Sequence, residues 1–167
     1  MKWVSSKIHY KNVNICKKTL FGKRIKMGYQ LTKPLRFKYK EGIFFVLNEG
    51  YVWDGASYPN ILKFLIGDKK LESVLAGSAL HDARKKIPTR YIGKDFNSGV
   101  RKIKYTNMSM SDGARFYKKT IDIWPIKEEK INSFQSTIQM VFLKLLHPLY
   151  LFFSTDSDWT IHENNLK

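Results

Sequence analysis

One histidine, three aspartates and one serine are the residues of this 167-residue chain whose types and spacing could support chemistry. They are Asp54, Ser57, His81, Asp82 and Asp95. A histidine beside carboxylates can act as a general base while one carboxylate holds its tautomer, and Ser57 could then be the nucleophile. The same groups could instead ligate a divalent metal at His81 and Asp54. The sequence leaves both kinds of chemistry open.

A structural role is the alternative for the same residues. Asp54 and Ser57 lie in a tight turn before Pro59, where side-chain oxygens often accept hydrogen bonds from turn and helix-cap donors. His81 follows Gly77 and Ser78 by four and three positions, so the imidazole lies on a helix face of small residues that another element can approach closely. We expect this face to meet the turn at 54–57 across a small cleft, with His81 either as a catalyst or as a buried polar brace.

The elements that position these residues can be read from the apolar pattern. Residues 35–40 alternate strictly between apolar and basic side chains, and 43–47 are a continuous apolar run. With 51–53 they predict a three-stranded antiparallel meander that ends at Asp54. The segment 1–34 predicts short strands with turns at Gly22 and Gly28.

The second half of the chain has helical periodicity. Leu71, Val74, Leu75 and Leu80 predict the helix that carries His81. We expect a loop at 89–94, a helix at 95–105 and a further helix capped by Ser111 and Asp112. The apolar stretch 138–153 is short for a membrane span and is interrupted by Pro148, so it should dock on the meander or on another subunit.

These patterns predict an α+β fold, in which a small antiparallel sheet from the N-terminal half is covered by helices from the C-terminal half. The expected division is a basic N-terminal arm or set of strands (1–34), a core domain (35–124), and an apolar helix with a polar tail (125–167). An apolar fraction of 43% excludes a disordered chain. The single cysteine, Cys16, excludes an internal disulfide.

Positive charge is concentrated at the start of the chain. The net charge is +16, and residues 1–40 contain twelve Lys or Arg and no Asp or Glu. This concentration of positive charge produces an electrostatic field that attracts polyanions such as nucleic acid or an acidic protein surface. Alternatively, the lysines simply form a solvent-exposed face without a partner. The candidate polyanion-binding or partner-binding residues are Lys17, Lys18, Lys23, Arg24, Lys26, Arg36, Lys38 and Lys40.

Four motifs in order resemble a phage and prophage family catalogued as domain of unknown function thirteen fifty-three. They are WDGASYP at 53–59, AGSALHD at 76–82, KDF at 94–96 and DGARFYKKTI at 112–121. The resemblance covers about residues 35–124. It implies a phage origin, and the family's activity is unassigned.

Two functions follow as expectations. The favoured one is a structural component of the virion, associated with tail or connector, that binds neighbouring phage structural proteins or nucleic acid through the basic region and the apolar C-terminal helix. It needs no cofactor and no membrane, and it would be made in the host cytoplasm and then enter the virion. The alternative is a small phage hydrolase that uses the histidine, aspartate and serine cluster, acting on cell-envelope material.

Overall fold

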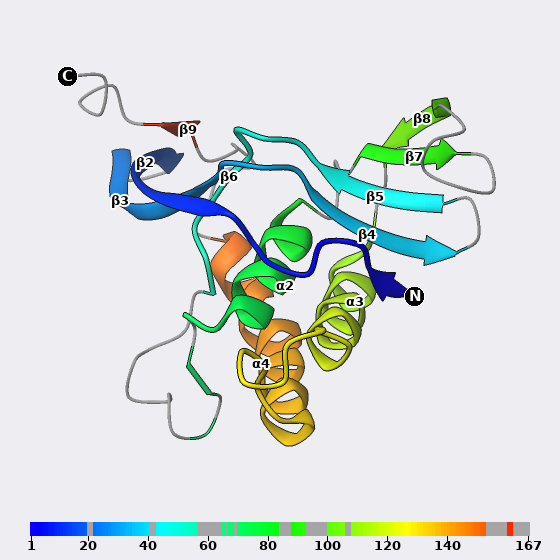
Figure 1. Cartoon of the computed structure of the whole chain (residues 1–167). Helices are drawn as coiled ribbons and strands as arrows, with labels where there is room; N and C mark the ends of the chain where they lie inside the picture. The colour runs from blue at the N-terminus through cyan, green and yellow to red at the C-terminus, as the bar shows by residue number, and fades with distance from the viewer. Residues whose placement is uncertain are drawn as a thin grey trace.

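The structure is a computed structural model that describes residues 1–19, 22–40, 43–56, 65, 67–68, 70–83, 88–92, 100–105, 108–152 and 160–161. It confirms the α+β class, because this part of the chain forms two antiparallel sheets and three helices. The sheets lie side by side above the helices, with α2 next to them and α4 at the bottom (Figure 1). The elements are β1 (Lys2–Trp3), β2 (Tyr10–Thr19), β3 (Gly22–Leu31), β4 (Leu35–Lys40), β5 (Ile43–Leu47), β6 (Val52–Trp53), α2 (Glu72–Asp82), β7 (Pro88–Ile92), β8 (Val100–Tyr105), α3 (Met110–Asp122), α4 (Ser133–Phe152) and β9 (Thr160–Ile161).

The first sheet has the strand order β1-β4-β5-β7-β8. The alternation predicted for β4 is confirmed, because Leu35 and Phe37 are buried while Arg36 and Lys38 are half-exposed. A register shift between Lys38 and Lys40 ends the strict alternation at the end of the strand. Four of the five residues of β5 are buried, as expected for a continuous apolar run.

The second sheet has the order β6-β3-β2-β9, and its centre is the long hairpin of β2 and β3. Gly22 begins β3 with a φ of 113°, a conformation that favours glycine at the predicted turn. The turn predicted at Gly28 is wrong, because Gly28 lies inside β3. A Cβ there would lie 2.3 Å from Cδ1 of Ile15 and 2.8 Å from the carbonyl oxygen of Trp53, so this glycine allows a close approach of strands.

The predicted meander is correct for its first two strands and wrong for the third. β6 pairs with β3, where Trp53 is opposite Tyr29, and β5 has β7 as its other neighbour. Gly50, with a φ of 85°, turns the chain out of the first sheet. The N–H of Gly50 then donates a 2.9 Å hydrogen bond to the carbonyl of Leu31, and the N–H of Leu31 donates a 2.9 Å hydrogen bond to the carbonyl of Tyr51. These backbone bonds attach β6 to the second sheet.

The loop predicted at 89–94 and the helix predicted at 95–105 are also wrong over the residues that the structure describes. Residues 88–92 and 100–105 form the antiparallel pair β7 and β8, with Arg90 opposite Ile103. Aromatic and β-branched residues such as Tyr91 and Ile103 favour strands when a neighbouring strand is available. Pro88 occupies the first position of β7, where a missing N–H is tolerated.

The helices pack in the order α2, α3, α4. Residues 73–81 of α2 are all buried, as expected for a helix enclosed on every side. α3 is capped by Ser109, whose hydroxyl oxygen accepts a 3.1 Å bond from the N–H of Asp112, so the cap lies two residues before the predicted one. α4 continues through Pro148 instead of breaking there, and its described residues pack mainly on α3. The predicted docking on another subunit stays a prediction.

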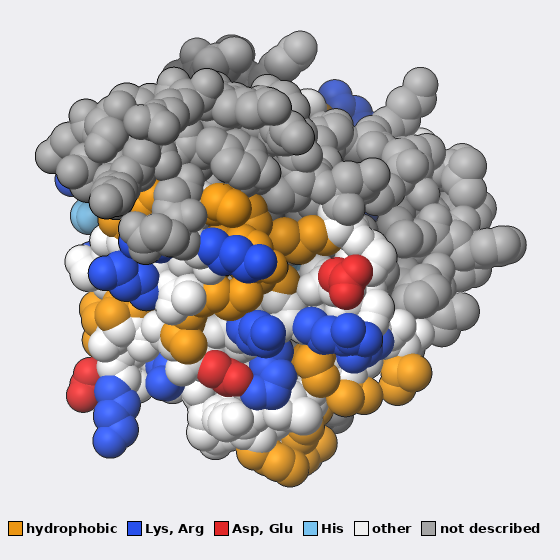
Figure 2. All heavy atoms as spheres, turned by 90° about the vertical axis from the view of Figure 1, so that its right-hand side faces the viewer, with side chains coloured by type: hydrophobic (Ala, Val, Ile, Leu, Met, Phe, Trp, Pro, Cys, Tyr) orange, Lys and Arg blue, Asp and Glu red, His pale blue; other side chains and the backbone are white. Residues whose placement is uncertain are grey.

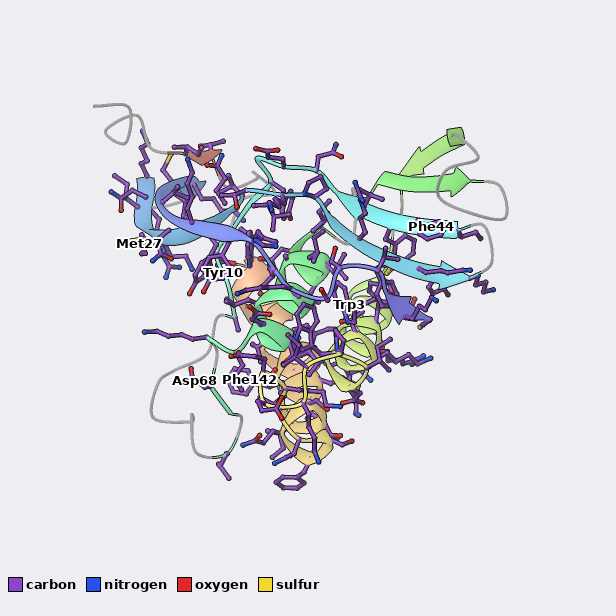
Figure 3. The ribbon with its side chains drawn as sticks, in the orientation of Figure 1. Trp3, Tyr10, Met27, Phe44, Asp68 and Phe142 are labelled. Carbon is purple, nitrogen blue, oxygen red and sulfur yellow. The ribbon has the colours of Figure 1, made fainter. Side chains whose placement is uncertain are left out.

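Trp3 attaches the first strand to the helices (Figure 3). Its indole N–H donates a 2.8 Å hydrogen bond to the carbonyl of Thr120 in α3. Its ring packs edge-on against Phe37 and Trp124, with centroid distances of 5.0 and 4.8 Å. The N-terminal segment is therefore a part of the sheet and the core.

Candidate functional site

The small-residue face of α2 does admit a close neighbour, and that neighbour is α3. A Cβ on Gly77 would lie 2.9 Å from Cγ1 of Ile121 and 3.2 Å from the ring of Tyr117. Residues four apart share a helix face, so His81 lies on the same side of α2 as Gly77. The prediction of a close approach is confirmed, with α3 as the approaching element.

His81 is packed inside the helical layer and is only 2% exposed. Its ring meets the ring of Tyr117 edge-on, at a centroid distance of 5.9 Å. Its Nδ1 lies 3.5 Å from Oδ1 of Asp82, which is half-exposed at the end of the helix. The hydroxyl of Tyr117 donates to the side-chain carbonyl of Gln139 in α4. A chain of polar and aromatic contacts thus joins the three helices.

Asp54 follows β6 and is held by the hairpin. Its side chain is 8% exposed, and its Oδ2 accepts a 2.7 Å bond from Nζ of Lys26 in β3. An ion pair this close, with the carboxylate shielded from solvent, fixes the end of β6 against β3.

The end of β6 and α2 do meet, through the residue before Asp54. The indole N–H of Trp53 donates a 3.2 Å bond to the hydroxyl of Ser78, which in turn donates a 2.9 Å bond to the carbonyl of Leu75. Sequence reasoning missed this contact, although Ser78 was already noted as a small residue on the face of His81. Ser57 and Asp95 lie outside the described residues, so the cleft between the 54–57 turn and His81 stays a prediction.

The chemistry open to these groups depends on access. A general base must come within hydrogen-bond distance of the proton that it removes, and the imidazole of His81 is enclosed by α2 and α3. Within the described ranges, no group of three or more His, Cys, Asp or Glu is placed to hold a metal ion. The burial of His81 favours the role of a structural brace, and the catalytic alternative stays a prediction.

The basic residues predicted to bind a polyanion fall into two groups on different sheets. In the hairpin the register places Lys17 opposite Arg24 and Lys18 opposite Lys23. Like charges directly opposite each other destabilise a sheet, so an anion bound at this end of the hairpin would relieve the repulsion. Lys26, farther along β3, is paired with Asp54.

The second group lies on β4. Arg36 and Lys38 share the outer face of the strand, and Lys2 of β1 is directly opposite Lys38. Nζ of Lys38 lies 5.9 Å from the ring centre of Phe44, and Nζ of Lys40 lies 5.6 Å from that of Tyr39. Figure 2 shows that Lys and Arg outnumber Asp and Glu on the described part of the face that lies to the right in Figure 1.

Over its described side chains, α4 buries two polar residues beside Leu143 and leaves several apolar residues exposed. Ser136 and Gln139 are buried, and the hydroxyl of Ser136 donates a 2.5 Å bond to Oδ1 of Asp122 in α3. On the other side, Phe134 is 69% exposed and Leu145 is 67% exposed. We call the five apolar residues of that side the outer face of α4; they are Phe134, Ile138, Val141, Phe142 and Leu145.

Helical geometry explains why these five residues form one stripe. At about 100° per residue, positions 134, 138, 141, 142 and 145 lie within roughly a third of a turn of one another. Ser136 and Gln139 lie on the opposite side, toward α3. Phe142 projects from α4 away from α3 (Figure 3). The burial expected of an apolar helix is therefore only partly achieved within the chain.

Comparisons with family models, with curated proteins and with solved structures find no significant match to this chain. Among the helices that the structure describes, none combines the length and the hydrophobicity needed to cross a membrane.

Proposed function

We propose that this protein is a structural component of a phage particle, and that it binds a neighbouring protein subunit through the outer face of α4. The observation that carries the proposal is the exposed apolar stripe of this helix, with Phe134 and Leu145 exposed although Ser136 and Gln139 of the same helix are buried. Large apolar side chains gathered on one helix face are typical of an interaction surface. Covering them would remove apolar area from water at about 25 cal/mol per Å².

The chemistry of this face suits a protein better than a nucleic acid. Its five side chains are aliphatic or aromatic and carry no charge, whereas a nucleic-acid surface is dominated by phosphates that need cations. Aromatic and aliphatic anchors at the centre of a patch are typical of protein interfaces. The face therefore has the composition of the central part of a subunit contact.

The phage assignment is supported by the four ordered motifs at 53–59, 76–82, 94–96 and 112–121. Membership in a particle makes a clear prediction, because a structural subunit is present in purified virions at a fixed ratio to the other subunits. Quantitative mass spectrometry of virions purified by density gradient measures this ratio. Absence of the chain from intact virions would remove the proposal.

The contact itself can be tested by the double variant Phe134→Gln/Leu145→Gln. Glutamine keeps helix propensity and removes the apolar side chains, so the fold should be retained while the affinity for the neighbouring subunit falls. Incorporation into virions should decrease at least tenfold, measured by complementation of a phage that lacks the protein. The two residues are exposed, so the thermal transition of the isolated variant should move little.

Met27→Thr is the matched control. Met27 is 62% exposed on the hairpin, so this substitution also removes an exposed apolar side chain, but far from α4. It should leave incorporation unchanged. Equal losses for the control and for the α4 variant would show that general surface hydrophobicity, and not this face, governs assembly.

A further inference from the structure

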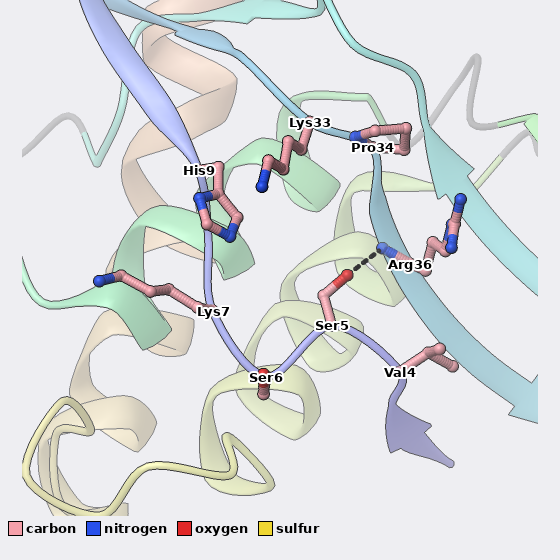
Figure 4. A pocket seen from close by; sticks show the side chains of 8 residues that line it. All are labelled: Val4, Ser5, Ser6, Lys7, His9, Lys33, Pro34 and Arg36. Atoms are coloured by element: carbon pink, nitrogen blue, oxygen red, sulfur yellow. Dashed lines mark hydrogen bonds between the residues drawn. The ribbon is translucent and has the colours of Figure 1, made fainter.

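A hollow of about 330 Å³ lies where two connections cross from one sheet to the other. The connection from β1 to β2 contributes one wall and the connection from β3 to β4 contributes the other. The described residues that line it are Val4, Ser5, Ser6, Lys7, His9, Lys33, Pro34 and Arg36 (Figure 4). Backbone bonds hold the walls together, since Thr32 N–H donates to the carbonyl of His9, and the N–H groups of Val4 and Ser5 donate to the carbonyl of Arg36.

Most of the charged groups of this hollow are cationic. Lys7, Lys33 and Arg36 line it together with His9, and the described lining contains no carboxylate. The nearest described carboxyl is that of Glu72, which interacts with Lys7 and His9 from beside the hollow. The side chain of Lys33 extends toward the ring of His9, while those of Lys7 and Arg36 extend to either side (Figure 4). Cations gathered around a concave surface raise the positive potential there and attract anions.

Ser5 adds a hydrogen-bond donor. Its hydroxyl oxygen accepts a 3.0 Å bond from the backbone N–H of Arg36, which orients the side chain within the hollow. A serine oxygen that already accepts a hydrogen bond still has its own hydrogen to donate. Lysine, arginine and serine donors around one hollow are the groups that proteins use to bind phosphate oxygens.

The cations also continue beyond the hollow. Arg36 belongs both to the lining and to the outer face of β4, where Lys38 follows it two residues later at a distance of about 6.6 Å along the strand. Lys2 lies opposite Lys38 on the neighbouring strand. A free phosphate would use only the hollow, whereas a chain of phosphates can use the hollow and the row. We infer that this hollow and the adjoining row form a binding site for the phosphate backbone of a nucleic acid.

This site is separate from the outer face of α4 and does not depend on the subunit contact. The experiment compares two charge reversals at exposed lysines, Lys33→Glu in the hollow and Lys119→Glu on α3. Both change the net charge from +16 to +14. Binding of a fluorescein-labelled single-stranded oligothymidylate to the full chain is measured by fluorescence anisotropy across a series of salt concentrations.

Lys33→Glu should weaken binding on the order of tenfold and reduce the slope of log affinity against log salt by about 0.7, the value for one lost phosphate contact on a single strand. Lys119→Glu should change the affinity by less than about twofold, because a charge at a distance is screened. Equal losses in the two variants would overturn the site, since overall charge alone would then explain binding. Absence of oligonucleotide binding by the unchanged protein would overturn it as well.

A competition arm separates a polymer from a small phosphate. Inorganic pyrophosphate and adenosine triphosphate are added to the preformed complex with the oligonucleotide. The inferred site predicts that both compete only at concentrations far above that of the oligonucleotide, because they cannot contact the row on β4. Competition by either compound at a concentration equal to that of the oligonucleotide would overturn the assignment to a nucleic-acid backbone.

Discussion

The ring of His81 packs edge-on against the ring of Tyr117 at a centroid distance of 5.9 Å, and this contact joins α2 to α3. Tyr117 in turn donates to Gln139, so the contact continues into α4. The imidazole is also only 2% exposed. We therefore expect this imidazole to stabilise the layer of helices.

His81→Ala should therefore lower the free energy of unfolding by about 2–4 kcal/mol, because it removes a buried ring and leaves a cavity beside Tyr117. Chemical denaturation at neutral pH measures the loss. Asp82→Asn is the control, since it changes a half-exposed neighbour and should cost under about 1 kcal/mol. A His81→Ala protein with an unchanged transition and a lost hydrolytic activity would instead establish the catalytic alternative.

The hydrogen bond from Trp53 to Ser78 should be the main polar link between β6 and α2. Trp53→Phe keeps most of the buried aromatic surface and removes the indole N–H, so it should cost about 1–3 kcal/mol through the lost bond and the reduced packing. Ser78→Ala removes the acceptor. In a double-mutant cycle the two costs should be non-additive by about 1 kcal/mol. Strict additivity would show that the bond contributes nothing to stability.

Glu72 should make stability depend on pH in a defined direction. Burial raises the pKa of this carboxyl, Lys7 lowers it and Glu129 raises it, and the net direction is upward. The folded state therefore binds the proton more tightly than the unfolded chain, so the charged carboxylate costs stability at neutral pH. That cost disappears as the pH falls through the raised pKa toward the ordinary value.

Glu72→Gln removes this titration and keeps the shape of the side chain. It should raise the thermal midpoint at pH 7, and the difference from the unchanged protein should vanish in acid, below the ordinary carboxyl range. Differential scanning calorimetry over a pH series provides the measurement. The matched control is Glu128→Gln, an exposed residue of the loop before α4. A stabilisation that persists at acid pH would contradict the electrostatic explanation.

Local patterns predicted the elements that depend on neighbouring residues. The alternation in 35–40 predicted a strand with one basic face, and the period of Leu71, Val74, Leu75 and Leu80 predicted α2. The same reasoning failed at 100–105, where the strand β8 forms although a helix was predicted. A strand of six residues exists only with a partner, and its pairing with β7 is not encoded by local propensity.

The amino-acid sequence by itself determined the fold class, the small-residue face at Gly77 and Ser78, and the concentration of positive charge in residues 1–40. Only the tertiary structure decided that α3 covers that face, that Trp53 pairs with Tyr29 in the second sheet, and that Lys33 and Arg36 line one hollow. The physical reason is that backbone hydrogen bonds between strands form with almost any side chains present. The partner of a strand is therefore selected by the packing of the whole chain. The orientation of α4 also depends on tertiary contacts. Gln139 and Ser136 of α4 form hydrogen bonds with Tyr117 and Asp122 of α3. This orientation leaves Phe134 and Leu145 exposed.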